Sequence, residues 1–293
     1  MSQHSPLGRI GVWSSAWTTA QNGDGMAYSG EYDDAAAELD ALGYGTIWLG
    51  GGPDVAYAAP LLAAAPRIVV ATGILSIWQH GAAEVAAGRA ELERAHPGRF
   101  LLGLGVSHSV LAKDYAKPYS AMREYLTALD SAPEPVPPAG RVLAALGPRM
   151  LELARDRTAG AHPYLVTPEH TARAREILGQ DALLAPEFKA VLDPDLETAR
   201  ATARAHLAMY LTLPNYTANL RRLGFTEDDL RDGGSDRLLD AVFALGDADT
   251  IATRAQEFLA AGADHLALQV VTAGTRTGLP LDAWRRLAAV LLP

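Results

Sequence analysis

Residues 68–80 read Ile-Val-Val-Ala-Thr-Gly-Ile-Leu-Ser-Ile-Trp-Gln-His, and the interpretation of the whole chain starts from this stretch. Its first part is a continuous apolar run rich in β-branched residues, which is typical of a strand buried on both faces of a parallel sheet. Gly73 interrupts the run. A glycine inside a strand either accommodates crowded packing or marks a bulge or a close approach to the backbone. The stretch by itself leaves both interpretations open.

Further stretches have strand character, and helical patterns separate most of them. They are residues 9–15, 44–49, 99–106, 141–145, 159–163, 188–192 and 264–271. Together with residues 68–80 they predict an α/β fold of the (β/α)8 type, a TIM barrel, over a single domain spanning residues 1–293. From residue 193 to residue 245 only helical signals occur. We therefore expect a helical insertion after strand seven that lies over the C-terminal ends of the strands.

A doubly wound open sheet is the alternative architecture. Such sheets bind nucleotides through a Gly-x-Gly-x-x-Gly turn that follows the first strand. The related sequence Gly103-x-Gly105-x-x-His108 lacks the third glycine and follows the fourth strand. The barrel is therefore favoured.

Composition and charge exclude several functional classes. The chain has 25 Lys and Arg against 34 Asp and Glu, a formal charge of −9, which argues against nucleic acid or an anionic membrane surface as a partner. Cysteine is absent, so there is no disulfide, thiolate nucleophile or Cys-ligated metal. The N-terminal residues lack the pattern of a signal peptide, and no apolar run reaches the roughly 20 residues of a membrane-spanning helix. We expect a cytoplasmic protein.

In a barrel the active site lies at the C-terminal ends of the strands. The residues at these ends are rich in glycine, aromatic residues and histidine and are nearly free of carboxylates. They are Ser14, Trp17, Gly50, Gly51, Ser76, Trp78, His80, Ser107, His108, Gly147, His162, Tyr164, Thr167, Gln269 and Thr272. No metal-ligand spacing or pair of catalytic carboxylates occurs in this set, so we expect no metal site. A large planar ligand that rests on backbone and aromatic surfaces, with a cofactor carrying the reactive chemistry, fits better.

Three histidines follow predicted strands and are the candidate catalytic groups. They are His108, His162 and His80, and a histidine there can act as a general acid or base because its pKa lies near the working pH. By contrast, His96 is explained by capping a helix end, and His206 is expected on the surface of the insertion.

Trp78 is the tryptophan expected in the pocket. Trp13, Trp48 and Trp284 are expected in the hydrophobic core. Two helix starts near the strand ends, Leu146-Gly147-Pro148 and Val166-Thr167-Pro168, offer unsatisfied backbone N–H groups that attract phosphate. Taken alone, each of them is explained more simply by ordinary helix initiation.

Several of these motifs together resemble the bacterial luciferase-like superfamily. They are Thr72-Gly73-Ile74-Leu75-Ser76-Ile77-Trp78, Leu102-Gly103-Leu104-Gly105-Val106-Ser107-His108, Ala144-Ala145-Leu146-Gly147-Pro148, the run from Gly160 to Thr171, and Gly246-Asp247-Ala248-Asp249. The resemblance covers essentially the whole chain and is strongest to the actinobacterial branch that uses the deazaflavin coenzyme F420.

The resemblance implies an oxidoreductase that transfers a hydride between coenzyme F420 and a small organic substrate. It further implies a non-prolyl cis peptide bond at Gly73-Ile74 that presses against the cofactor ring, a phosphate site near Leu146-Gly147 and Val166-Thr167, and an acid near the reacting face of the ring at His108. The residues expected to contact the cofactor are Ser14, Gly50, Gly73, Ile74, Trp78, Ser107, Ala145, Leu146, Gly147, Tyr164, Val166 and Thr167.

The chain departs from the family pattern at the end of its second strand. Many relatives carry an acidic residue or a histidine there, and this chain has Gly50-Gly51-Gly52. Two alternatives therefore remain beside the F420-dependent oxidoreductase, namely a monooxygenase of the same fold that uses flavin mononucleotide (FMN) and a barrel that binds a cofactor without catalysis. The sequence names no substrate, and a homodimer is possible.

Overall fold

The structure is a computed structural model of the full chain, and it describes residues 7–19, 30–107, 116–274 and 278–293. His108, the first candidate catalytic histidine, lies outside these ranges.

The described strands form one parallel sheet. They are β1 (Ile10–Ser14), β2 (Thr46–Leu49), β3 (Val69–Thr72), β4 (Leu75–Ser76), β5 (Phe100–Gly105), β6 (Arg141–Leu143), β7 (Gly160–Ala161), β8 (Leu183–Leu184), β9 (Glu187–Leu192), β10 (Phe243–Gly246) and β11 (Leu266–Val270). Their order is β10-β9-β11-β1-β2-β3-β5-β6-β7-β8, with β4 paired to β5. The predicted α/β class is confirmed, and the sheet curves as a half barrel whose C-terminal strand ends gather at one side.

The chain between β8 and β9, with the first residue of β9, contacts the segment after β7 on one side and β11 on the other. The backbone N–H of Glu187 donates to the carbonyl of Pro163, just past β7, and the N–H of Ala267 in β11 donates to the carbonyl of Pro186. Because β8 and β9 follow each other within a few residues, hydrogen bonds run from the β6–β7 side of the sheet to the β11–β1 side.

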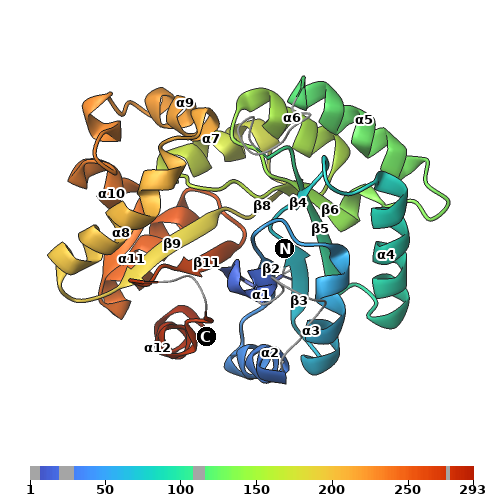
Figure 1. The fold of residues 1–293 in the computed structure, drawn as a ribbon, viewed down its shortest axis with the longest axis horizontal. Helices are drawn as coiled ribbons and strands as arrows, with labels where there is room; N and C mark the ends of the chain where they lie inside the picture. The colour runs from blue at the N-terminus through green and yellow to red at the C-terminus, as the bar shows by residue number, and fades with distance from the viewer. Residues whose placement is uncertain (1–6, 20–29, 108–115, 275–277) are drawn as a thin grey trace.

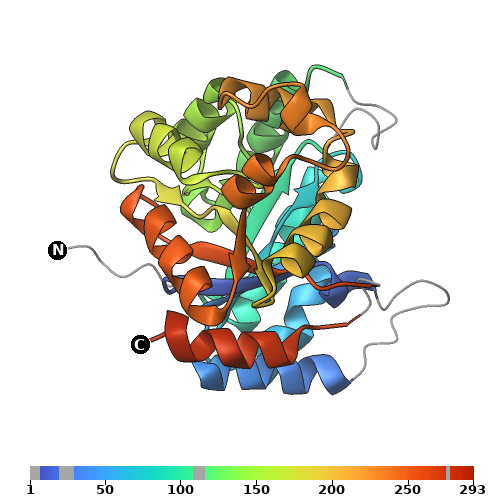
Figure 2. The same ribbon diagram turned by 90° about the vertical axis from the view of Figure 1, so that its left-hand side faces the viewer.

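Helices lie around the sheet, most of the longer ones on its outer side (Figure 1). They are α1 (Ala16–Thr19), α2 (Gly30–Leu42), η1 (Val55–Tyr57), α3 (Ala58–Ala64), α4 (Ala82–Ala95), α5 (Pro118–Asp130), η2 (Pro138–Gly140), α6 (Pro148–Arg157), α7 (Pro168–Leu178), α11 (Ala248–Ala260) and α12 (Leu281–Leu291). The last helix, α12, lies beside α2 in both views (Figures 1 and 2). The hydroxyl of Tyr44 donates to the carbonyl of Trp284, and Trp284 stacks on Trp17. These contacts join the two ends of the chain.

Between β9 and β10 lie α8 (Leu196–Tyr210), α9 (Pro214–Arg222), η3 (Asp228–Leu230) and α10 (Asp236–Val242). These helices share a hydrophobic cluster that includes Leu207, Leu220 and Leu238. The predicted helical stretch ended at residue 245, whereas Phe243–Gly246 is a strand whose Phe243 pairs with Lys189 of β9. The prediction was wrong there because one edge of β9 is paired with β11 and the backbone N–H and C=O groups on its other edge need partners. The apolar segment after α10 supplies these partners by pairing with residues 189–192.

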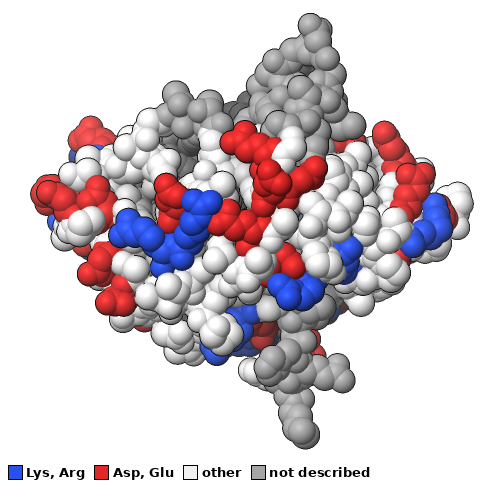
Figure 3. Space-filling model, turned by 90° about the horizontal axis from the view of Figure 1, so that it is seen from below, with Lys and Arg blue, Asp and Glu red and all other residues white. Residues whose placement is uncertain are grey.

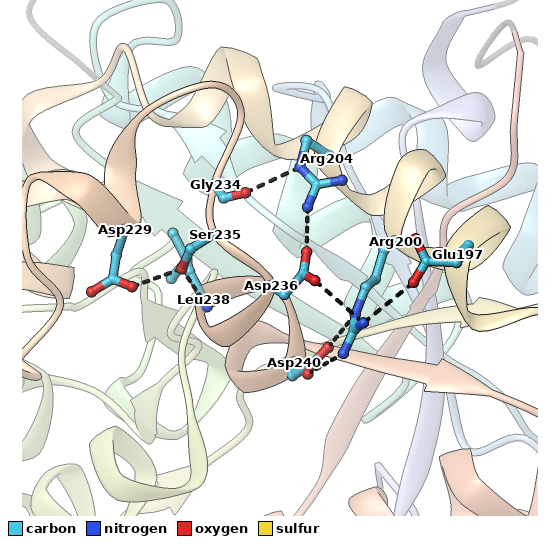
Figure 4. A network of polar contacts seen from close by, with 9 residues as sticks. All are labelled: Glu197, Arg200, Arg204, Asp229, Gly234, Ser235, Asp236, Leu238 and Asp240. Carbon is cyan, nitrogen blue, oxygen red and sulfur yellow. Dashed lines mark hydrogen bonds and ion pairs between the residues drawn. The ribbon is translucent and has the colours of Figure 1, made fainter.

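Ion pairs hold α10 against α8 (Figure 4). The Arg200 guanidinium donates to both oxygens of Asp240, at 3.1 and 2.7 Å, and also lies 3.3 Å from Asp236. Arg204 donates to Asp236 and to the carbonyl of Gly234. His206, expected on the surface, is instead buried beside Tyr210 and Phe243, because it faces inward from α8.

Acidic side chains gather near the centre of the face seen from below in Figure 3, in keeping with the net charge of −9. Within the ranges that the structure describes, no helix combines the length and the apolar character needed to cross a membrane.

Candidate active site

A cavity of about 760 Å³ opens at the C-terminal ends of the strands. Its lining comes from the sheet's strand ends, the starts of α5 and α6, and the inner face of α8 and α9. The strand ends contribute Trp13, Ser15, Gly51, Gly52, Gly73, Ile74, Ser76, Gln79, Val106, Ser107, Ala144, Ala145, His162, Tyr164 and Gln269. No aspartate or glutamate of the described residues lines it.

The floor of the cavity is a bulge between β3 and β4. Ala71 pairs with Leu101 and Leu75 with Leu104, so four steps along this chain segment match three along β5. One residue is therefore extra, which is the definition of a β-bulge. The peptide bond between Gly73 and Ile74 in this bulge is cis.

The neighbouring strand β5 is shaped to accept the bulge. The hydroxyl of Thr72 donates to the carbonyl of Gly103 and accepts from its N–H, both at 2.8 Å, and so replaces the missing ladder contacts. A Cβ on Gly103 would lie 1.9 Å from the carbonyl oxygen of Thr72, and one on Gly105 would lie 1.6 Å from Cδ1 of Ile74. The Leu-Gly-Leu-Gly pattern of this strand is thus a steric requirement of the bulge.

Trp13 of β1 forms a wall between the ends of β2 and β3. Its Nε1–H donates to the carbonyl of Gly73 at 3.0 Å. A Cβ on Gly50 would lie 2.4 Å from the ring, so the ring fills the place that a side chain at position 50 would take. Trp13 was expected in the core. It is buried, but it also lines the cavity, whereas Trp48 and Trp284 lie fully in the core.

His162 lies beneath the bulge with its ring stacked on Trp48, at 4.1 Å between centroids. Its Nδ1 lies 2.7 Å from the carbonyl oxygen of Ala185. Because a carbonyl oxygen can only accept, Nδ1 carries the proton and Nε2 holds a lone pair. This Nε2 is buried without a hydrogen-bond partner among the described residues, 3.4 Å from where a Cβ of Gly73 would lie.

Burial lowers the pKa of His162 to about 4. The imidazole is therefore neutral at pH 7, and its cavity-facing nitrogen accepts hydrogen bonds. A neutral acceptor of this kind suits positioning of a ligand N–H or O–H, and it does not suit the general-acid role considered from the sequence.

Two hydrogen-bonded tyrosine hydroxyl groups line the side of the cavity next to α8 and α9. The hydroxyl of Tyr164 donates to Oε1 of Gln269 at 2.8 Å and lies 2.8 Å from the hydroxyl of Tyr210. Desolvation raises the pKa of Tyr164 well above its usual value, so the phenol stays protonated. Behind it, the Lys189 ammonium lies 3.6 Å from the Tyr164 ring centroid and 2.7 Å from Glu187.

The opposite side of the cavity carries positive charge. Gly147 is the N-cap of α6 and Pro148 its first residue. Because Pro148 has no N–H and the N–H of Met150 donates to the carbonyl of Gly147, the first turn offers the backbone N–H of Arg149 to this region. The Arg149 and Arg222 side chains line the cavity here, and Nη1 of Arg222 lies 3.7 Å from an ideal Cβ on Gly147. Neither guanidinium has a carboxylate partner among the described residues, so the positive charge at this end of the cavity is not neutralised by the protein.

The loop before α6 is held by a histidine from the next helix. Nε2 of His170 lies 3.0 Å from the carbonyl of Leu146. The start of α7 itself does not reach the cavity, because the Thr167 hydroxyl accepts from the backbone N–H of His170 and caps its own helix. Of the two predicted phosphate-binding helix starts, only the one at Gly147 lines the cavity.

The residues expected at the site divide into two groups. Those that line the cavity are Gly73, Ile74, Ser107, Ala145, Leu146, Gly147, Tyr164 and His162. Those that do not are Ser14, Gly50, Trp78, His80, Val166 and Thr167.

Local contacts explain why these residues turn away. The Ser14 hydroxyl accepts from the N–H of Ala16, and the Trp78 indole donates to the carbonyl of Val106 at 2.6 Å. His80 lies 3.4 Å from the carboxylate of Asp54, and Val166 is buried in the core. Gly50 stands behind the Trp13 ring.

Sequence reasoning missed the residues that come from α5, α6 and the insertion. They are Tyr119 and Pro118 of α5, Arg149 and Met150 of α6, and Met209, Tyr210, Leu213, Asn215, Tyr216, Ala218 and Arg222. The insertion was expected to lie over the strand ends, but its helical pattern does not say which residues face inward. Gly50 and Gly73, at the ends of neighbouring strands, could have predicted one such lining residue. Two glycines in these places leave room for a large side chain from an adjacent strand, which here is Trp13.

Comparison with known proteins agrees with this architecture. Residues 10–139 match the sequence profile of the family described as luciferase-like monooxygenase. No curated protein matches the chain in sequence. Among solved structures, the coenzyme F420-dependent tetrahydromethanopterin reductase from Methanopyrus kandleri superimposes with a TM-score of 0.74 at 14% identity, covering 97% of this chain and 98% of that one.

Two other similar solved structures use different cofactors, one F420 and the other FMN. An F420-dependent secondary alcohol dehydrogenase in complex with an F420-acetone adduct has a TM-score of 0.70 at 14% identity, over 97% of this chain and 99% of that one. The oxygenating constituent of 3,6-diketocamphane monooxygenase from Pseudomonas putida, in complex with FMN, has a TM-score of 0.69 at 14% identity, over 97% and 96%. The resemblance to the luciferase-like family is confirmed, through residues 10–139 in sequence and through the α/β fold of the whole chain.

Proposed function

We propose that this chain is a deazaflavin-dependent oxidoreductase, which transfers a hydride between coenzyme F420 and an organic substrate. In this proposal the sheet is a (β/α)8 barrel, and the helices between β9 and β10 are the insertion that covers the strand ends. The observation that carries the proposal is the cavity itself, because it joins an uncharged floor at a bulge to an anion-binding end at α6.

The residues fit a planar, phosphate-bearing cofactor. Gly73 leaves the floor without a side chain, between the Trp13 indole and Nε2 of His162. That buried nitrogen has no partner among the described residues, so a ligand N–H or O–H at this place would satisfy it. At the other end, the first turn of α6 with Arg149 and Arg222 suits a phosphate group.

Each part of the site has a separate task in this proposal. The bulge and Trp13 support the ring, Nε2 of His162 fixes its orientation, and the α6 end holds the phosphate. The bound deazaflavin supplies a carbon that donates or accepts a hydride. The protein keeps water from the ring through Leu213, Tyr210 and Tyr216 of the insertion, each of which is buried.

An FMN-dependent monooxygenase is the second candidate, supported by the FMN complex among the structural neighbours. Equilibrium titration of the purified full-length chain with oxidised coenzyme F420 and, separately, with FMN discriminates between the two. We expect saturable binding of F420, followed by fluorescence and by thermal shift, with weaker binding of FMN. Tight binding of FMN without any response to F420 overturns the proposal in favour of the monooxygenase.

A barrel that only binds cofactor is distinguished by turnover. With F420 bound, a panel of alcohols, ketones and enones is screened for loss or gain of the oxidised cofactor's absorbance. Hydride transfer to or from any member of the panel excludes the non-catalytic alternative.

A further inference from the structure

One wall of the cavity is formed by α8 and α9, and its composition indicates a class of substrate. This inference rests on the proposed function. At this wall α8 and α9 present Met209, Tyr210, Leu213 and Tyr216. Tyr210, Leu213 and Tyr216 are buried, whereas Met209 is 43% exposed and forms the rim. An apolar side chain at the mouth, continuous with a buried apolar wall, suits an apolar ligand.

The aromatic rings of this wall form one continuous surface with the strand ends. Tyr164 lies 5.3 Å from Trp13, 5.6 Å from Tyr210 and 6.0 Å from Tyr216, measured between ring centroids. Rings at these spacings, tilted against one another, provide faces and edges on which a flat apolar molecule packs.

The charges of the cavity lie elsewhere. No carboxylate among the described residues lines it, and its two lining guanidinium groups, Arg149 and Arg222, belong to the α6 end. Helix α9 links the two ends, since Tyr216 and Arg222 are six residues apart, or about 9 Å along the helix axis. The buried Lys189 behind the wall is already paired with Glu187 at 2.7 Å. A carboxylate at the aromatic end would lose its hydration without a cationic partner. An ammonium ion there would meet a Tyr164 ring that already holds the Lys189 ammonium 3.6 Å from its centroid, and the two like charges repel.

Gln269 offers a polar group to a substrate at this wall. Oε1 of Gln269 accepts from the Tyr164 hydroxyl, which fixes the amide so that its NH₂ group lies on the other side. Gln269 lines the cavity, so this NH₂ can donate to an oxygen of the ligand.

We infer that the substrate is an uncharged, largely apolar organic molecule that carries a carbonyl or hydroxyl oxygen. It packs on Trp13, Tyr164, Tyr210 and Tyr216, and its oxygen accepts a hydrogen bond from Gln269. The site selects against carboxylates and ammonium ions of the same shape.

The test compares three probes of similar two-ring shape: 1-tetralone, 1-naphthoate and 1-naphthylmethylammonium. Each is titrated calorimetrically into the full-length protein after saturation with oxidised coenzyme F420, whose own binding is measured first. We expect 1-tetralone to bind about tenfold or more tightly than either charged probe, because only it avoids unpaired burial of charge. Equal binding of the three, or tighter binding of a charged probe, overturns the inference.

A matched pair of variants locates the selectivity. Met209 and Leu196 lie on the same helix and are both 43% exposed, but only Met209 lines the cavity. Met209→Lys is expected to strengthen binding of 1-naphthoate about two- to fivefold and to weaken that of 1-tetralone, since a surface ion pair contributes at this scale. Leu196→Lys should change neither. The same response in both variants, or none in Met209→Lys, contradicts the assignment.

The outcomes separate this inference from the proposed function. If F420 binds and 1-tetralone does not, the cofactor assignment stands and the substrate class is wrong. If F420 does not bind, the proposed function fails before the probes are tested.

Discussion

The indole of Trp13 donates to the carbonyl of Gly73 at 3.0 Å, so a side chain from the first strand holds the bulge of the third. The same ring occupies the space beyond Gly50 at the end of the second strand. Glycines at two neighbouring strand ends and one tryptophan thus form a single unit. This unit explains why the second strand ends in glycine, since the Trp13 ring fills the space that a side chain at position 50 would take.

Replacing Gly50 with alanine should disturb this unit. The new Cβ would lie 2.4 Å from Cη2 of Trp13, so the ring must move away from the Gly73 carbonyl. We expect the free energy of unfolding to fall by about 1–3 kcal/mol, the usual cost of overpacking, and the affinity for cofactor to fall with it. Urea unfolding and cofactor titration measure the two effects.

Gly30→Ala is the control, because a Cβ at position 30 meets nothing within 4 Å. It should leave both quantities close to those of the wild type. If Gly50→Ala leaves the free energy of unfolding and the cofactor affinity as unchanged as Gly30→Ala does, the contact between Trp13 and the Gly73 carbonyl does not stabilise the bulge.

Buried histidines should make the fold acid-sensitive. Desolvation lowers the pKa of both His162 and His265 to about 4, against 6.5 for an unfolded chain. Between these values the unfolded state binds protons that the folded state does not, so stability is constant above about pH 6.5 and falls as the pH drops toward 4. At pH 5 each histidine should lower the free energy of unfolding by about 2 kcal/mol relative to pH 7.

Replacing His162 with glutamine tests this assignment. The variant should lose about half of the histidine-linked acid sensitivity between pH 7 and pH 5, measured by urea unfolding at each pH, because only His265 remains. An unchanged pH profile in the variant would show that His162 titrates normally in the folded state.

Arg222 should contribute to cofactor affinity through the phosphate. We expect Arg222→Ala to weaken binding of a phosphate-bearing cofactor about three- to tenfold at low ionic strength, and less at high salt, because exposed charges are screened. Arg123→Ala is the matched control, since Arg123 is also exposed but lies on α5 and does not line the cavity. Loss of affinity in both variants would point to net charge and not to a site at α6.

The buried pair of Lys189 and Glu187 should be sensitive to loss of one partner. Their side chains are 0% and 1% exposed, and burial already raises the pKa of Glu187. Lys189→Met should lower the free energy of unfolding by about 3–5 kcal/mol, since it leaves a buried carboxyl without its counter-ion. Adding Glu187→Gln should recover part of this loss, because the unpaired charge is then removed.

An exposed pair provides the comparison. Arg231 and Asp228 lie 2.7 Å apart with side chains that are 69% and 84% exposed. Arg231→Met should change stability by no more than about 1 kcal/mol. A double variant at 187 and 189 that is less stable than Lys189→Met alone would contradict the role given to the buried charge.

Local patterns in the sequence were sufficient for the α/β class, the order of most strands and the break at Gly73. The β-branched run at residues 68–72 forms a buried strand because its side chains pack on both faces of the sheet, and this requirement is visible in composition. Thr167-Pro168 likewise started a helix at the expected residue. The same local signals failed at Phe243–Gly246. That segment is a strand because it pairs with β9, a contact between distant parts of the chain that no local pattern encodes.

What the sequence by itself determined is therefore the α/β class, most of the strands and helices, and the interruption of the third strand at Gly73, because hydrophobic period and backbone sterics act over a few neighbouring residues. Only the tertiary structure decided which side chains face the cavity. Trp13 lines the cavity, whereas the Trp78 indole donates to the carbonyl of Val106. Arg222 lies beside Gly147 although the two residues are 75 positions apart in the chain. Those outcomes depend on how distant elements pack and on which buried polar groups find partners, and neither is encoded in any single stretch.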